Sequence, residues 1–216
     1  MNNIETNNNV TVIHPIQPSN NISQESINNC IAIAKLNCLN KKLFNNCCDA
    51  SCPIYNNSVS KCVSNGAFDA EIMLIDAFPS EYETFTGSFT DEKGYLLEES
   101  IRSSKHKRSD IYCTNIIKCF NVQDTNESII SNCLQNYFLK ELEMIHPKKL
   151  ILTYSAFQAC LKYKIIPYIG NINYFTKTNV VICGNINTDM YVIYDLKNLT
   201  VQQEEAFKQG MNYILS

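Results

Sequence analysis

Short apolar runs alternate with helix-like segments over most of the chain, and this alternation constrains the fold more than any other feature. The runs are four to nine residues long and occupy residues 70–78, 111–119, 149–154, 180–183 and 191–194. Their length, apolar content and flanking polar residues or proline are typical of buried strands. The segments between them have helical periodicity, which is clearest over residues 126–146, where Pro147 ends the pattern.

This order of elements predicts an α/β fold, a three-layer α/β/α sandwich with a mostly parallel central sheet. In such sheets the binding site lies outside the carboxyl ends of the strands. Polar residues occupy those ends here, at residues 76–80, 115–119, 154–155 and at Asp195. We therefore expect the functional residues to come from these four places.

Length and composition limit the other possibilities. A chain of 216 residues suits one domain, and its net charge of −3 gives no broad basic field for nucleic acid, although a local basic groove remains compatible with it. No apolar run reaches the roughly 18 residues of a membrane span. The Asn-rich residues 1–25 lack the basic and apolar regions of a signal peptide, so we expect a disordered tail there and a single domain over residues 26–216.

Eleven cysteines are many for a chain with no export signal. A disulfide framework is not expected in a reducing compartment, which leaves metal binding or buried thiols. Cys48 and Cys52 precede the first strand, with Cys47 able to replace Cys48, while Cys119 ends the second strand and Cys133 lies in the long helix. Four thiolates could hold zinc or a four-iron cluster, but this spacing matches neither the usual zinc-ribbon nor the ferredoxin pattern, so both uses stay open. The remaining cysteines are expected to pack as small apolar side chains: Cys30, Cys38, Cys62, Cys113, Cys160 and Cys183.

Five segments carry a pattern in a fixed order. They are CDASCPIY, AEIMLI followed by Pro79, GSFTDEKGYLLEE, SDIYCTNIIKC, and ISNCLQNYFLKELEMIHPKKLILTYSAFQACL. Together they resemble the iron–sulfur uracil-DNA glycosylases, family 4, and the related phage DNA-polymerase-associated domain. The strongest match is SDIYCTNIIKC, which is similar to the Asp-Val-Tyr-Ile-Thr-Asn-x-x-Lys-Cys of that family.

The resemblance implies a uracil-DNA glycosylase-like fold and the excision of uracil from DNA by N-glycosidic bond hydrolysis after base flipping. It implies a [4Fe-4S] cluster ligated by Cys48, Cys52, Cys119 and Cys133, with Cys47 the alternative to Cys48 because one extra residue separates the first pair. It also implies that the amide of Asn115 reads the uracil edge and that Phe89 stacks on the base, although the proline that precedes this Phe in the family is missing here.

Two catalytic positions depart from the family pattern. The Gly-Glu-Ala-Pro-Gly loop reads DAFPS here, so Ala77 replaces the glutamate, Asp76 replaces a glycine, and the bulky Phe78 stands at the expected pocket floor. Asp195 stands where the family has a histidine, and an ionised aspartate repels a uracil anion. Loss of an anion-stabilising donor costs roughly 10²–10³ in rate. Loss of a positioned acid or base costs roughly 10²–10⁴. Asp76 and Asp195 are then the remaining catalytic candidates, and impaired excision is expected.

The alternative function is a non-catalytic DNA-binding or replication and repair accessory protein on the same scaffold. In both cases the expected partner is uracil-containing or single-stranded DNA, with a replication protein as a further partner, no membrane, and a monomeric state. The expected location is the cytoplasm, or the host-cell cytoplasm if the chain is phage-encoded. The basic residues 105–108 either contact phosphate or form a solvated turn.

Overall fold

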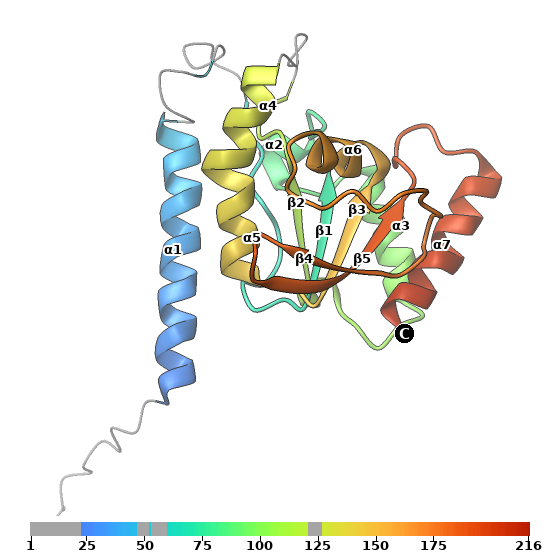
Figure 1. Ribbon diagram of the computed structural model, residues 1–216, viewed down its shortest axis with the longest axis horizontal. Coiled ribbons are helices and arrows are strands. Elements are labelled where there is room, and N and C mark those ends of the chain that lie inside the picture. The colour runs from blue at the N-terminus through green and yellow to red at the C-terminus, as the bar shows by residue number, and fades with distance from the viewer. Residues whose placement is uncertain (1–22, 47–51, 53–59, 121–126) are drawn as a thin grey trace, which may run out of the picture.

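The computed structural model describes residues 23–46, 52, 60–120 and 127–216 (Figure 1). Within these residues one sheet has the strand order β2-β1-β3-β5-β4. Its strands are β1 (Ile72–Asp76), β2 (Ile111–Asn115), β3 (Lys149–Thr153), β4 (Thr178–Ile182) and β5 (Ile186–Ile193). All neighbours are parallel except β4, which pairs antiparallel with β5. The predicted strands and the mostly parallel sheet are confirmed, and β5 begins five residues earlier than the apolar run at residue 191 suggested.

Helices cover both faces of the sheet, so the predicted three-layer architecture is confirmed. Along β1, Met73 and Ile75 face one layer, and Ile72 and Leu74 face the other, because side chains alternate along a strand. The first layer contains α4 (Glu127–Cys133), α5 (Leu139–Ile145) and α6 (Tyr154–Lys162). The second contains α3 (Glu92–Ile101) and α7 (Val201–Leu215).

The helix ends follow the local sequence. Asp91 caps α3 by accepting a hydrogen bond from Lys93 N, and Thr200 with Gln203 forms a capping box at the start of α7. The helix predicted over residues 126–146 is formed by α4 and α5, which are joined without a gap by one π-helical segment, Leu134–Phe138. His146 ends it in a left-handed conformation, and Pro147 follows.

Two elements were not foreseen from the sequence. A long helix, α1 (Gln24–Asn46), packs alongside α5 (Figure 1). Residues 60–65 pair antiparallel with the outer edge of β2 and its continuation, through Asn65 with Cys113 and through Cys62 N donating to Lys118 O at 2.8 Å. The short helix α2 (Glu83–Thr86) and the 3-10 turn Arg108–Asp110 complete the described elements.

The predicted tail over residues 1–25 falls almost wholly outside the described residues and stays a prediction, as does the extent of the domain. None of the helices in the described residues is both long and apolar enough to span a membrane.

Candidate functional site

The carboxyl ends of three parallel strands bring polar side chains together inside the protein. Asp76 ends β1 and lies opposite Asn115, which ends β2, in the register of the sheet. Thr153 ends β3 and donates a hydrogen bond from Oγ1 to Asp76 Oδ1 at 2.9 Å. All three side chains are buried. Of the strand ends that the sequence pointed to, Asp76 and Asn115 thus lie side by side, and Thr153, which was not singled out, binds Asp76.

The carboxylate of Asp76 is held from several sides. Oδ1 accepts from the backbone N–H of Ala77 at 2.8 Å in addition to Thr153. Oδ2 accepts from Nζ of Lys93 in α3 at 2.8 Å. These donors fix the orientation of the carboxylate and leave one acceptor position open on Oδ2.

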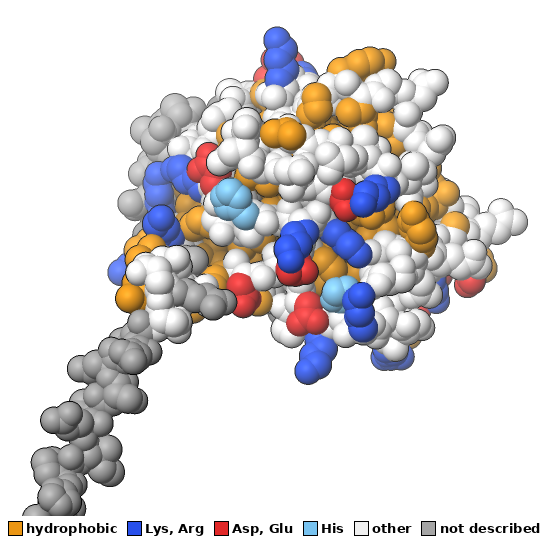
Figure 2. All heavy atoms as spheres, turned by 60° about the horizontal axis from the view of Figure 1, so that its bottom comes forward, with side chains coloured by type: hydrophobic (Ala, Val, Ile, Leu, Met, Phe, Trp, Pro, Cys, Tyr) orange, Lys and Arg blue, Asp and Glu red, His pale blue; other side chains and the backbone are white. Residues whose placement is uncertain are grey.

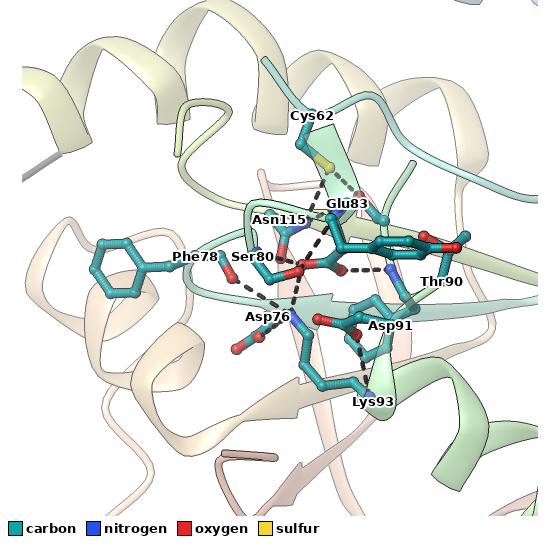
Figure 3. A network of polar contacts seen from close by, with 12 residues as sticks. Cys62, Asp76, Phe78, Ser80, Glu83, Thr90, Asp91, Lys93 and Asn115 are labelled. Carbon is teal, nitrogen blue, oxygen red and sulfur yellow. Dashed lines mark hydrogen bonds and ion pairs between the residues drawn. The ribbon is translucent and has the colours of Figure 1, made fainter. Parts of the chain in front are cut away.

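Lys93 joins Asp76 to a second buried carboxylate, Glu83 of α2 (Figure 3). Its Nζ lies 2.8 Å from Glu83 Oε2 and 3.4 Å from the carbonyl oxygen of Phe78. Glu83 also accepts from Phe89 N at 2.5 Å and from Ser80 N at 2.6 Å. We call Asp76, Glu83 and Lys93 the charged triad. It ties the loop after β1 to α2 and to the first turn of α3.

Lys93 stays protonated in this setting. Burial alone lowers the pKa of a lysine, but the negative charges of Asp76 and Glu83, and their hydrogen bonds, outweigh it and raise the pKa of Lys93 above its ordinary value. With two carboxylates and one ammonium, the ionised triad carries a net charge of −1.

Sequence reasoning missed Lys93 and Glu83. A signal for Lys93 exists, because it precedes Leu97 by four residues and Ile101 by eight, so it stands on the apolar face of α3. A lysine on a buried helix face needs a partner, and the partner was not visible in the sequence pattern because α2 is only one turn long.

Asn115, the residue expected to read uracil, is fully buried. Its Nδ2 donates to Ser88 Oγ at 3.0 Å and to Cys62 Sγ at 3.5 Å. Its Oδ1 has no hydrogen-bond partner among the described residues. Ser88 and Cys62 were not foreseen as neighbours of this amide, because residues 60–65 carry no strand pattern.

The two predicted phenylalanines lie in different surroundings. Phe89, with a φ of 57°, is buried between α2 and α3, and Lys93 Nζ lies 5.2 Å from its ring centroid. A Cβ on Gly94 would lie 2.2 Å from the carbonyl oxygen of Phe89, so glycine allows α3 to approach this turn. Phe78 is 37% exposed and points away from the charged triad (Figure 3). It lines a separate hollow of about 300 Å³ with residues of α6 and of the loop after β2.

An open groove of about 660 Å³ borders the charged triad. Ser80, Thr90 and Lys93 line one part of it, and the loop after β5 lines the other. The groove also carries the carboxylates of Glu81, Asp91 and Glu92, and the lysines Lys93 and Lys197.

Asp195 follows β5 and binds the start of α6. Its Oδ1 accepts from Ser155 N and its Oδ2 from Ser155 Oγ, both at 2.8 Å. A carboxylate is favoured at this end of a helix because the first N–H groups point toward it. Next to it, the rings of Tyr154, Tyr174 and Tyr194 form a surface cluster.

The cysteines expected to ligate a cluster are partly described. Cys52, Cys119 and Cys133 are all buried, and Cys52 and Cys119 share one apolar cluster with Tyr137, which lies one helical turn after Cys133. Cys48 and its alternative Cys47 lie outside the described residues. Within the described residues, no three His, Cys, Asp or Glu side chains are grouped so that they could hold a metal ion.

The other cysteines divide into two groups. Cys62, Cys113 and Cys160 are buried as expected, and burial raises the pKa of Cys113 and of Cys160 to about 12. The expectation of burial was wrong for Cys30, Cys38 and Cys183, which are exposed on α1 and on the turn after β4. Residue type alone does not say which face of a surface helix a thiol occupies.

The basic residues 105–108 precede the amino end of β2, whereas Asn115 lies at the carboxyl end of the same strand. Lys105 donates to Ser216 O at 2.8 Å, and Arg108 donates to Ile111 O at 3.1 Å. Figure 2 brings this lower side of Figure 1 forward and shows Lys and Arg side chains interspersed with acidic ones. These contacts support the interpretation of residues 105–108 as a structured turn.

Comparisons with known proteins agree with the order of these elements. The family model described as the uracil DNA glycosylase superfamily matches residues 63–212. A "Type-4 uracil-DNA glycosylase" of Thermotoga maritima is 29% identical over 103 residues, which cover 47% of this chain and 54% of that protein. Proteins with the same name are 28% identical over 103 residues in Archaeoglobus fulgidus (46% and 51% covered) and 25% identical over 113 residues in Pyrobaculum aerophilum (51% and 56%). The chain thus spans about half the length of the curated relatives it matches.

Proposed function

Because the chain belongs to the uracil DNA glycosylase superfamily, we propose that it binds a uracil base extruded from DNA and hydrolyses its N-glycosidic bond slowly. The observation that carries this proposal is Asn115, whose buried amide at the end of β2 donates from Nδ2 to Ser88 and keeps Oδ1 as an open acceptor. A buried polar atom without a partner is costly in a folded protein, and a base edge would satisfy it.

Slow hydrolysis follows from the carboxylates that remain. Ala77 carries no acid at the position where the resemblance has a glutamate. Asp76 is the proposed substitute, acting through the open acceptor position on Oδ2, but Lys93 and Thr153 already hold it. Asp195 faces the N-terminus of α6 through Ser155, so its proposed part is to hold that helix beside the site.

The test is single-turnover excision from an oligonucleotide containing one uracil, at enzyme excess, with a thymine oligonucleotide as the control substrate. We expect measurable release of uracil at a rate at least about 10² below that of an intact acid–base pair. The Asp76→Asn variant should lose the remaining rate while its circular dichroism spectrum stays unchanged. Equal rates for wild type and Asp76→Asn would refute the role of this carboxylate.

We further propose a [4Fe-4S] cluster held by Cys48, Cys52, Cys119 and Cys133. The burial of Cys52 and Cys119 in one cluster, with Cys133 a turn from Tyr137, fits this ligand set. The cluster would act structurally, by joining the segment before β1 to the loop after β2 and to α4. No step of the excision reaction is assigned to it.

The cluster is tested by anaerobic purification, iron and sulfide analysis, and the visible absorption spectrum. Four iron atoms per chain are expected. Cys119→Ser and Cys133→Ser should lower the iron content, whereas Cys160→Ser, a buried thiol in α6, should not. Cys47→Ser and Cys48→Ser decide which of the two is the ligand. A folded protein without iron would refute the cluster.

A second candidate function is a DNA-binding or replication accessory protein without catalysis. The observation in its favour is that Asp76 and Asp195 both have intramolecular partners on each carboxylate oxygen. Binding of single-stranded DNA without release of uracil over many hours would support this function against the first one. A replication protein would then be sought as the partner.

A further inference from the structure

The side-chain amide of Asn115 is buried, and its nitrogen and its oxygen differ in their hydrogen bonding. Nδ2 donates to both Ser88 Oγ and Cys62 Sγ, at 3.0 and 3.5 Å. Oδ1 has no partner among the described residues. Asn115, Ser88 and Cys62 are each at most 1% exposed. Both amide protons are therefore used within the protein, and the open group is an acceptor.

The backbone carbonyl of Val63 fixes the direction of these hydrogen bonds. A carbonyl only accepts, and this one accepts from Ser88 N at 2.9 Å, from Ser88 Oγ at 3.1 Å and from Cys62 Sγ at 3.5 Å. Ser88 Oγ also lies 3.3 Å from Cys62 Sγ, and with its proton directed to Val63 or to Cys62 its oxygen accepts from Asn115 Nδ2 at 3.0 Å. The nitrogen of the amide, and not its oxygen, therefore faces Ser88.

Cys62 supports the same orientation. Burial and the nearby charge of Glu83 raise the pKa of the Cys62 thiol, against the lowering effect of its hydrogen bond with Ser88 and of Lys118. The thiol stays protonated, donates toward Val63 and accepts from Asn115. Two separate groups thus hold the amide in one orientation.

This orientation determines which base edges the site can read. Uracil presents an N–H donor at N3 beside an acceptor at O4, whereas cytosine presents an acceptor at N3 beside an amino donor at N4. An amide that is held in one orientation, with its oxygen toward N3 and a free N–H toward position 4, forms two hydrogen bonds with uracil. With cytosine the same amide places donor against donor and acceptor against acceptor. An amide whose protons are already used forms a single hydrogen bond with either base, through Oδ1.

We propose that Ser88 and Cys62 are positioning residues that make Asn115 an acceptor-only reader, so that the site takes pyrimidines by an N–H donor and discriminates weakly between uracil and cytosine. This inference rests on the proposed function, since it concerns the base that reaches Asn115. Ser88 and Phe89 are followed in the sequence by Thr90, which lines the open groove.

The test measures binding, so that it does not depend on the rate of excision. Fluorescein-labelled single-stranded oligonucleotides carry one 2′-fluoroarabino nucleotide, which resists cleavage, with uracil, cytosine or no base. Anisotropy titrations give the dissociation constants. Wild type should bind both bases more tightly than the abasic oligonucleotide, with a uracil preference below about tenfold, because one good bidentate pair accounts for roughly tenfold or more.

In Ser88→Ala and in Cys62→Ala, one N–H of the Asn115 amide loses its partner within the protein and can donate to O4 of uracil. Each should raise the uracil-to-cytosine preference by about tenfold. Ser100→Ala is the matched control, because Ser100 is also a buried serine but donates only to Leu96 O within α3. Its preference should equal that of wild type. Circular dichroism checks the fold of each variant. If only one of the two site variants folds, that variant alone is enough for the test.

The outcomes separate the two proposals. A wild-type preference for uracil above about tenfold overturns the inference and leaves the proposed function standing. An unchanged preference in folded Ser88→Ala or Cys62→Ala protein overturns it as well. If neither base binds better than the abasic oligonucleotide, the proposed function fails, and the inference fails with it.

Discussion

Replacing Lys93 tests whether the charged triad holds the site together. Lys93→Met keeps most of the side-chain volume and removes the ammonium that lies 2.8 Å from both Asp76 and Glu83. Removing one partner of a buried ion pair costs about 3–5 kcal/mol, because the remaining charge stays buried without compensation. Asp76 and Glu83 keep two other donors each, so we expect a loss near the lower limit, about 3 kcal/mol.

The pH dependence of this loss identifies its cause. In wild type the pKa of Lys93 is raised above its ordinary value of about 10.4, so its contribution to stability is complete below that pH and is lost only as pH rises toward the folded-state pKa. Lys93 therefore contributes fully at pH 7, and the stability difference between wild type and Lys93→Met should begin to shrink only above about pH 10.

Urea denaturation followed by circular dichroism measures these free energies at each pH. Lys208→Met is the matched control, because Lys208 pairs with Glu99 at 2.7 Å on the surface between α7 and α3, where an ion pair contributes little. In a double-variant cycle, Glu83→Gln should recover part of the loss in Lys93→Met, since only one buried charge then lacks a partner. A loss below about 1 kcal/mol at pH 7 would refute the reasoning.

Three further predictions concern Asn115, Asp195 and the cysteines. Asn115→Ala should abolish uracil excision in the oligonucleotide assay while urea denaturation still shows a cooperatively folded protein, and unchanged excision would exclude its reading role. Asp195→Asn should lower the free energy of unfolding by about 1 kcal/mol, as loss of a helix cap does, and should leave excision within about threefold of wild type. A thiol reagent followed by mass spectrometry should modify the exposed Cys30, Cys38 and Cys183 well before the buried Cys113 and Cys160, whose thiol pKa values are about 12. Equal labelling of all five would contradict the packing described for β2 and α6.

The sheet could be predicted because β1, β2 and β3 are buried apolar runs with sharp ends, whereas β4 is half exposed and the first half of β5 is mostly polar. Asn115 could be singled out for the same reason, since an amide inside such a run needs a partner. The partners themselves were not predictable. Ser88 and Cys62 reach Asn115 from residues 27 and 53 positions away, and nothing in their local sequence marks that contact.

The charged triad escaped prediction for a related reason. Lys93 reads as a polar residue near the start of an amphipathic helix, and Glu83 belongs to a one-turn helix that has no periodicity of its own. Only the chain path after β1, which returns across the strand ends, brings them to Asp76. Helix α1 was missed because its apolar residues are spread around the helix and do not form one apolar face, and its surface is largely exposed.

The net charge of the triad bears on how excision could proceed at all. During cleavage of an N-glycosidic bond the sugar gains positive charge and the leaving base gains negative charge. A buried group of charge −1 near the strand ends stabilises the first and destabilises the second, because electrostatic interactions are strong where water is excluded. Asn115 offers the base an acceptor and no donor, so it does not stabilise the anion either. Under the proposed function, the charged triad would favour the positive sugar and not the negative base, and we expect the departure of the base to limit the rate of excision.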